Sequence, residues 1–187
     1  MDQRRSRLDL RERLFDLIKD RSFRRGDFTL ASGKKSAYYF DSKSTMLHPE
    51  GASLLAELIL DELRDVKADC VGGFEMGAVP LIAPVAMKSV EAGRPLHGFF
   101  VRKAPKDHGT KQRVEGLDMS GKTAVILEDV TTTGGSAMQA IEEVRAAGGT
   151  VALVLSILDR GEGAAELYAA AGVPFKSLFR AEEFLRD

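Results

Sequence analysis

Residues 123–136 read Thr-Ala-Val-Ile-Leu-Glu-Asp-Val-Thr-Thr-Thr-Gly-Gly-Ser, and this stretch decides the fold. The apolar run 123–127 predicts a buried strand. We expect that strand to end on two acids, Glu128 and Asp129, which a hydroxyl- and glycine-rich turn follows. A helical pattern begins at Ala137. A strand, such a turn and a helix start together indicate an anion-binding loop, because backbone N–H groups and a helix N-terminus both attract negative charge.

The two acids of this stretch have a different chemistry from the turn. Carboxylates before the turn would repel a phosphate, whereas their oxygens suit hydroxyl groups or Mg²⁺. A single loop that offers acids to a sugar diol and amides to a phosphate predicts a sugar phosphate as ligand.

Composition sets outer limits on the function. The chain has 187 residues, of which 44% are hydrophobic and 29% charged, as is usual for one soluble globular domain. Its net charge of -1 gives no basic field that would favour nucleic acid. Cys70 is the only cysteine, so an internal disulfide is excluded and a reducing compartment is expected. We find no signal peptide and no run that spans a bilayer, and we expect a cytoplasmic protein.

Hydrophobic periodicity predicts strands that alternate with helices. This alternation implies an α/β fold with a mostly parallel central sheet flanked by helices. Ligands of such sheets gather at the carboxyl ends of the strands, where the polar motifs of this chain lie. We expect helices at 8–20, 49–63, 77–91, 136–147 and 163–171, strands at 69–74, 96–101, 123–128 and 150–157, a last strand and helix from Phe175, and short extended strands around a turn at 26–41.

A second constellation is basic. The segment 102–116 lacks apolar periodicity and contains Gly109, which indicates a mobile loop. Such a loop is either a solvated surface or a lid whose cations stabilise a charged leaving group and exclude water. Its cationic residues are Arg102, Lys103, Lys106, Lys111 and Arg113, with His108 beside them.

Three segments resemble one family. Residues 125–136 resemble the phosphoribosyl-pyrophosphate (PRPP) motif of type I phosphoribosyltransferases. Residues 102–109 are similar to the flexible catalytic loop of orotate phosphoribosyltransferases, and residues 28–41 to the segment that covers the base in those enzymes. The resemblance implies a single domain, residues 1–187, with the type I phosphoribosyltransferase fold. It also implies a small N-terminal hood over the base site (about 20–45) and a mobile lid (about 102–116).

The resemblance assigns residues to PRPP. Residues 131–136 would cradle the 5′-phosphate, and the two acids would hold the ribose hydroxyls. Mg²⁺ is the implied cofactor, bound mainly through PRPP and, through a water, at Asp129. The residues implied to be catalytic are Lys103, Lys106, His108 and Asp129. The implied PRPP contacts are Arg102, Lys103, Lys106, His108, Glu128, Asp129, Val130, Thr131, Thr132, Thr133, Gly134, Gly135 and Ser136.

The base site follows from the same resemblance and from the chemistry of orotate. A flat pyrimidine can stack on an aromatic ring, for which Tyr39 and Phe40 are the candidates unless they are core residues. A carboxylate suits an arginine fork. Arg160 matches the family's orotate-binding arginine, or else pairs with Asp159 at the surface. Thr132 matches the threonine that touches orotate.

The chain departs from the family at two positions. Some members carry lysine where this chain has Ala31 and Met76. Lys34 or Lys35 could replace the first of these charges. Residues 72–80 otherwise fit the pyrophosphate-binding loop of the fold, in which backbone amides can bind an anion.

The resemblance implies orotate phosphoribosyltransferase activity, which forms orotidine 5′-monophosphate and pyrophosphate in UMP biosynthesis. It further implies a homodimer with shared active sites, because the family's lid reaches into the neighbouring subunit. Three other interpretations stay open: transfer to another base such as a purine, a non-catalytic PRPP sensor, and an α/β domain without a PRPP site. The segment 28–41 and Arg160 argue against a purine. The absence of a helix-turn-helix pattern argues against a regulator.

Overall fold

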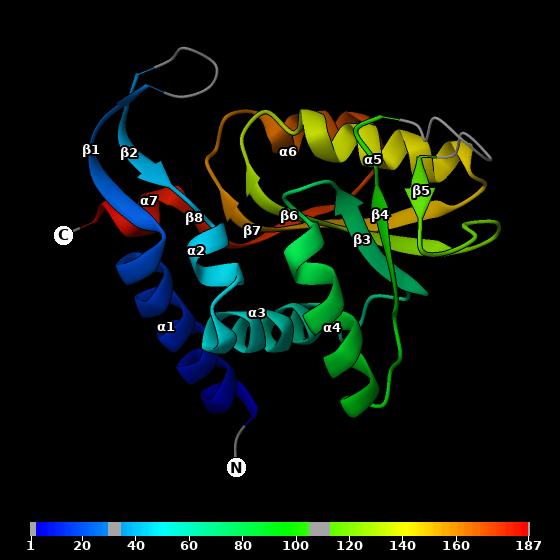
Figure 1. Cartoon of the computed structure of the whole chain (residues 1–187), viewed down its shortest axis with the longest axis horizontal. Coiled ribbons are helices and arrows are strands. Elements are labelled where there is room, and N and C mark those ends of the chain that lie inside the picture. The colour runs from blue at the N-terminus through cyan, green and yellow to red at the C-terminus, as the bar shows by residue number, and fades with distance from the viewer. Residues whose placement is uncertain (1–2, 30–34, 105–112, 187) are drawn as a thin grey trace.

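The computed structural model describes residues 3–29, 35–104 and 113–186. A six-stranded sheet with the order β5-β4-β3-β6-β7-β8 forms the centre of the molecule (Figure 1). Every neighbouring pair is parallel except β4 and β5, as the alternating pattern predicted. The strands are β3 (Cys70–Phe74), β4 (His97–Val101), β5 (Val114–Glu115), β6 (Thr123–Thr131), β7 (Thr150–Asp159) and β8 (Phe175–Arg180).

Helices cover both faces of this sheet (Figure 1). Strand residues alternate between two cores: Val71 and Val125 belong to the core that includes α1, α3 and α4, whereas Cys70 and Ala124 belong to the core that includes α5 and α6. Strands buried on both faces read as continuous apolar runs, which is why β6 was recognisable. The helices are α1 (Gln3–Arg21), α3 (Pro49–Glu62), α4 (Val79–Glu91), α5 (Gly135–Ala146) and α6 (Ala164–Ala170). None of the helices in the described ranges is long and apolar enough to cross a bilayer.

The hood is a separate antiparallel pair, β1 (Phe23–Thr29) and β2 (Lys35–Phe40), followed by the short α2 (Lys43–Met46). It lies beside the end of the central sheet, next to the C-terminal α7 (Ala181–Leu185) (Figure 1).

An aromatic cluster attaches the hood to the rest of the fold. The ring of Phe184 in α7 lies 4.4 Å from Phe15 of α1, 5.8 Å from Phe23 of β1 and 6.0 Å from Phe40 of β2, measured between centroids. Each of these pairs lies within the range of favourable aromatic contact. The last helix of the chain therefore ties the hood to α1.

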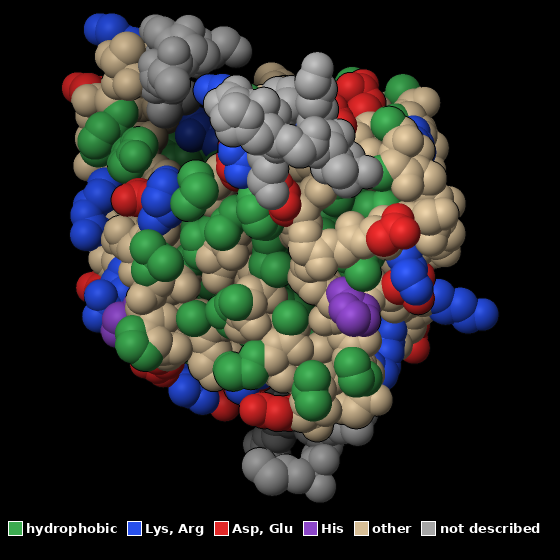
Figure 2. All heavy atoms as spheres, turned by 45° about the vertical axis from the view of Figure 1, so that its right-hand side comes forward, with side chains coloured by type: hydrophobic (Ala, Val, Ile, Leu, Met, Phe, Trp, Pro, Cys, Tyr) green, Lys and Arg blue, Asp and Glu red, His purple; other side chains and the backbone are tan. Residues whose placement is uncertain are grey.

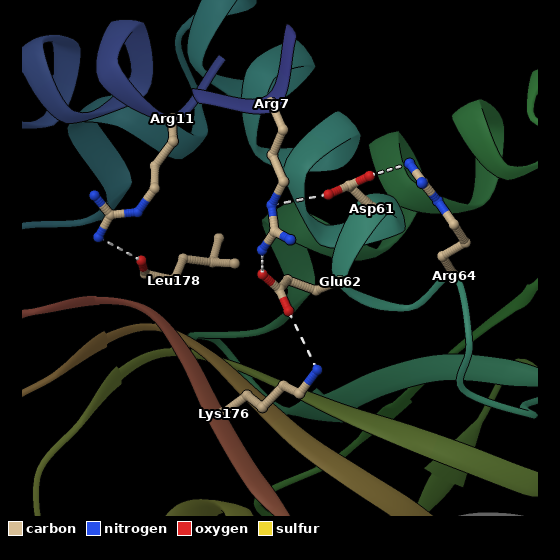
Figure 3. Close-up of polar contacts among 7 residues, drawn as sticks. All are labelled: Arg7, Arg11, Asp61, Glu62, Arg64, Lys176 and Leu178. Carbon is tan, nitrogen blue, oxygen red and sulfur yellow. Dashed lines mark hydrogen bonds and ion pairs between the residues drawn. The ribbon is translucent and has the colours of Figure 1, made fainter. Parts of the chain in front are cut away.

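Charged residues join α1 to α3 and β8 (Figure 3). Arg7 contacts Asp61, with 3.0 Å between Nε and Oδ2, and also pairs with Glu62. Glu62 in turn accepts from Lys176 of β8 at 3.3 Å. Exposed ion pairs contribute about 0–1 kcal/mol each, so these contacts orient α1 more than they stabilise it.

The structure corrects one boundary that matters for function. β6 does not end at the acids as expected, because Val130 and Thr131 still pair with Leu158 and Asp159 of β7. The two acids therefore lie inside the strand. The sequence also gave no sign of α2 or β5, which have four and two residues and are too short to show a period.

Candidate active site

The site lies where the order of the strands reverses. β4 follows β3 along the chain and lies on one side of it, whereas β6 lies on the other. In such sheets the crevice at the carboxyl ends of the strands is the usual ligand site. The segments after β3 and within β6 meet there so closely that a Cβ atom on Gly77 would lie 2.4 Å from Oδ1 of Asp129. Only glycine lets the backbone approach this acid.

The loop between β6 and α5 has the form of an anion cradle. Thr133, Gly135 and Ser136 are exposed, whereas Thr131 is buried at the base of the loop. Gly134 is the N-cap of α5 and has a φ of +86°, a conformation that L side chains rarely adopt. The amides at the start of α5 therefore face a polar, accessible turn, which is the arrangement that binds phosphate.

Tyr168 of α6 supports this loop from below. It is fully buried, and its ring would lie 2.9 Å from a Cβ atom at position 134. Gly134 is thus required for its backbone conformation and for the space under it. Sequence reasoning missed Tyr168, because the pattern of α6 marks it only as a buried helix residue.

The two acids have different surroundings. The hydroxyl of Ser42 donates to Oδ2 of Asp129 at 2.5 Å. The segment after the hood therefore contacts β6 directly at this acid. Glu128 is only 7% exposed, and burial, followed by the charge of Asp129, raises the pKa of its carboxyl to about 8. Burial and then the charge of Glu128 also raise the pKa of Tyr168. Adjacent strand residues point to opposite faces, so Asp129 meets the α2 side and Glu128 the α6 side.

Arg160 leaves the end of β7 and lies under the hood. Its backbone N–H donates to the carbonyl of Thr131 at 2.9 Å, which places it beside the anion cradle. Its guanidinium pairs with Glu162 at 2.8 Å and stacks on the ring of Tyr38, whose centroid is 4.6 Å from Cζ. Asp159, the surface partner considered for it, instead accepts from the backbone of Gly161 at 2.8 Å.

The aromatic residues of β2 divide by strand alternation. Phe40 is 8% exposed and packs in the aromatic cluster, as expected of the alternative in which its ring belongs to the core. Tyr39 is 43% exposed and packs against Phe28 at 5.5 Å. Tyr38, which sequence reasoning passed over, is the ring in contact with Arg160. A period of two along β2 would have placed Tyr38 on the face of Phe40 and opposite Tyr39.

The base of the lid is fixed at the same edge of the sheet. The N–H of Arg102 donates to the carbonyl of Arg113 at 2.8 Å, and that of Lys103 donates to Glu75 Oε1 at 2.6 Å. Arg113 pairs with Glu143 of α5 at 2.7 Å, so its charge is directed toward α5. The predicted contacts Lys106 and His108 lie outside the described residues, as do Lys111, Ala31 and Lys34.

The donors present fit a metal that arrives with its ligand. Within the described ranges, no group of three or more His, Cys, Asp or Glu side chains is arranged to hold a metal ion. Asp129 supplies one carboxylate, of which Oδ2 already accepts from Ser42. Mg²⁺ takes six oxygen ligands, and water and substrate phosphates commonly provide most of them.

A parallel α/β sheet with a sugar-phosphate loop at its switch point, a hood and a lid base defines a type I phosphoribosyltransferase. No family model matches the chain. An orotate phosphoribosyltransferase of Rhodopseudomonas palustris (strain TIE-1) is 57% identical over 179 residues, which are 94% of this chain and 96% of that protein. The chain belongs to the orotate phosphoribosyltransferase family.

Solved structures agree with this assignment. Orotate phosphoribosyltransferase of Mycobacterium tuberculosis H37Rv, in complex with Fe(III) dicitrate, has a TM-score of 0.85 at 33% identity, covering 94% of this chain and 98% of that one. The same enzyme in complex with PRPP has a TM-score of 0.81 at 31% identity, covering 95% and 99%.

Proposed function

We infer that this chain transfers the 5-phosphoribosyl group from PRPP to orotate, giving orotidine 5′-monophosphate and pyrophosphate in pyrimidine biosynthesis. The observation that carries the inference is the position of Arg160. Its amide is bound to Thr131 of the sugar-phosphate loop, and its guanidinium lies under the hood. A group that binds a carboxylate therefore lies beside a group of amides that binds a phosphate, as a carboxylated base and a ribose phosphate require.

The chemistry is displacement at the anomeric carbon through an oxocarbenium-like transition state. Such a reaction needs no covalent intermediate, so the protein contributes orientation and electrostatic stabilisation. We assign the 5′-phosphate to the amides and hydroxyls of residues 131–136, with Val130 leading into the loop. Thr132, a partly exposed member of this loop, would also contact the base.

We assign the ribose hydroxyls to the two acids in different roles. Asp129 is a hydrogen-bond acceptor that Ser42 holds in place. Because the pKa of Glu128 is raised to about 8, its carboxyl is mostly protonated at pH 7 and can donate as well as accept.

The lid would cover the pyrophosphate. Lys103 lies near the start of the lid. The hydrogen bond from its backbone N–H to Glu75 fixes Lys103 next to the loop that follows β3. We assign the developing negative charge of the leaving group to Arg102, Lys103, Lys106 and His108. Removal of one such transition-state donor costs on the order of 10²–10³ in rate.

Mg²⁺ would enter with PRPP and approach Asp129 through a water. The chemistry that the ion would supply is neutralisation of charge on the pyrophosphate leaving group. Asp129 of β6, which lies against Gly77 in the loop after β3, is the carboxylate that we assign to it.

We further propose a homodimer whose subunits share their active sites. Hydrophobic side chains gather on the face of the molecule shown in Figure 2. The large exposed apolar residues include Met87 and Val90 of α4, Met76 before it and Leu47, which are between 60% and 70% exposed. Exposed apolar side chains of this size mark interfaces when they are contiguous. A cytoplasmic location belongs to the same proposal.

Activity itself is tested by following orotate absorbance with PRPP and Mg²⁺, beside uracil, hypoxanthine and adenine. We expect turnover of orotate alone, and a large rise in the KM for orotate in Arg160→Ala. Transfer to a purine with an unchanged KM in Arg160→Ala would contradict the assignment of the base.

Sharing of the sites has a separate test. Lys103→Ala and Asp129→Asn are each expected to be inactive or nearly so. If the lid and the sugar loop of one site come from different chains, mixing the variants under conditions of subunit exchange restores one intact site per mixed dimer. Confirmed exchange without recovery of activity would show that each chain completes its own site.

A further inference from the structure

Arg160 is held from three directions before any ligand is present. Glu162 Oε1 lies 2.8 Å from Nε, and Nη2 donates to Ser36 Oγ at 3.4 Å. The ring of Tyr38 covers one face of the guanidinium at 4.6 Å. The arginine side chain is only 9% exposed as a result.

These contacts leave the end of the guanidinium for a ligand. Arginine carries five N–H groups, one on Nε and two on each terminal nitrogen. Among the described residues, Glu162 takes the Nε–H and Ser36 one N–H of Nη2. Among the described residues, Nη1 has no hydrogen-bond partner and Nη2 has one, so both terminal nitrogens retain N–H groups. A fork with such groups can bind a carboxylate with two parallel hydrogen bonds.

The holding residues are themselves fixed. Tyr38 packs on Phe23 at 5.8 Å, and Phe23 belongs to the aromatic cluster around Phe184. The hydroxyl of Ser36 donates to the carbonyl of Tyr38 at 2.7 Å. This hydrogen bond links the two residues of β2 that contact Arg160. A long side chain otherwise loses rotamer freedom when a ligand orders it. Here the fold has already ordered it.

Glu162 also balances the charge of the buried guanidinium of Arg160. A guanidinium so far removed from water is costly unless a charge of opposite sign is near it. The carboxylate of Glu162, with a side chain 30% exposed, provides that charge from the Nε side and does not block the terminal nitrogens.

We propose that Tyr38 and Glu162 are positioning residues that aim Arg160 at the carboxylate of the pyrimidine, and that they set the preference for orotate over uncarboxylated bases. This inference rests on the proposed function, in which Arg160 binds that carboxylate. Neither residue contacts the substrate in this scheme, and both act through the geometry of the arginine.

The test measures kcat and the KM for orotate and for PRPP in five variants. Tyr38→Leu and Glu162→Ala remove a holding contact and are expected to raise the KM for orotate by about five- to twentyfold, with the KM for PRPP within about twofold. Tyr38→Phe keeps the ring and is expected to stay near the parent protein. Glu162→Gln keeps an acceptor but removes the charge, so its KM for orotate is expected to lie between those of the parent protein and Glu162→Ala. Arg160→Ala reports on the proposed function itself.

Arg24→Ala is the matched control in the hood. Arg24 is an exposed residue of β1 whose guanidinium contacts only the backbone of Asp20 and Phe23 among the described residues. It is expected to leave both KM values unchanged. An equal rise in the KM for orotate in Arg24→Ala and Tyr38→Leu would mean that any disturbance of the hood weakens binding. This result would contradict a specific role for Tyr38.

The outcomes distinguish failure of the proposed base site from failure of the positioning role of Tyr38 and Glu162. If Arg160→Ala leaves the KM for orotate unchanged, the proposed base site fails. If Arg160→Ala raises it while Tyr38→Leu and Glu162→Ala do not, only the positioning role fails. A lower KM in Glu162→Ala would show that Glu162 competes with the substrate. Should Tyr38→Leu not fold, Glu162→Ala carries the test because its side chain lies at the surface.

Discussion

Single residues decide the shape of the phosphate cradle. Gly134 has a positive φ and lies directly over the ring of Tyr168. Gly135, its neighbour, has no positive φ and open space around its α-carbon. The two adjacent glycines therefore have different roles. Only Gly134 is required by the backbone conformation and by packing.

We predict that Gly134→Ala destabilises the protein by about 1–3 kcal/mol, because the alanine is strained at this φ and its methyl group meets Tyr168. Gly135→Ala is the control for stability and is expected to cost less than about 1 kcal/mol. Urea unfolding of both variants measures the difference. Equal losses would contradict the account of the loop.

The raised pKa of Glu128 predicts that the free energy of unfolding depends on pH. The folded state raises its pKa from 4.5 to about 8, so the folded chain keeps a proton that the unfolded chain releases. The contribution is fully present below pH 4.5 and is lost as the pH rises through 8. Glu128→Gln has no such proton. Relative to this variant, the parent protein should lose on the order of a few kcal/mol of unfolding free energy between pH 5 and pH 9. Parallel pH profiles from urea titrations would contradict the burial of this carboxyl.

At the scale of elements, the site depends on segments far apart in the sequence. The hood supplies Tyr38 and Ser36, α2 begins after Ser42, and α7 anchors the hood through Phe184. The five-residue helix α7 is thus part of what holds the hood in place.

We predict that Phe184→Ala costs about 3–5 kcal/mol of stability, since it removes a fully buried ring from a cluster of aromatic side chains. Leu185→Ala, whose side chain belongs to the same helix but is 42% exposed, should cost less than about 1 kcal/mol. Denaturant unfolding compares the two. A loss below about 1 kcal/mol in Phe184→Ala would mean that α7 does not secure the hood.

At the scale of the whole molecule, the fold brings the segments that follow β3, β4, β6 and β7 to one edge of the sheet. The described residues there do not form a metal cluster of their own. Because we propose that Mg²⁺ is bound mainly through PRPP, its chelation is expected to abolish phosphoribosyl transfer and to leave the melting temperature of the free protein within about 1 °C. A clear fall in melting temperature on chelation, seen by circular dichroism, would reveal a metal site within the protein.

The sequence determined those features whose cause is local. The succession of strands and helices follows from the hydrophobic period. The strand, turn and helix start of the predicted phosphate site follow from residues 123–136 alone, because they are contiguous there. Arg160 could be placed at a strand end for the same reason.

Only the tertiary structure decided which side chains meet. That β6 continues through Glu128 and Asp129 depends on pairing with β7, so the acids lie on opposite faces. That Tyr38 rather than Phe40 contacts Arg160, and that Ser42 holds Asp129, depends on how the hood docks on the sheet. Such contacts join residues more than 80 positions apart in the chain. Packing fixes them, and no local pattern of residues records them.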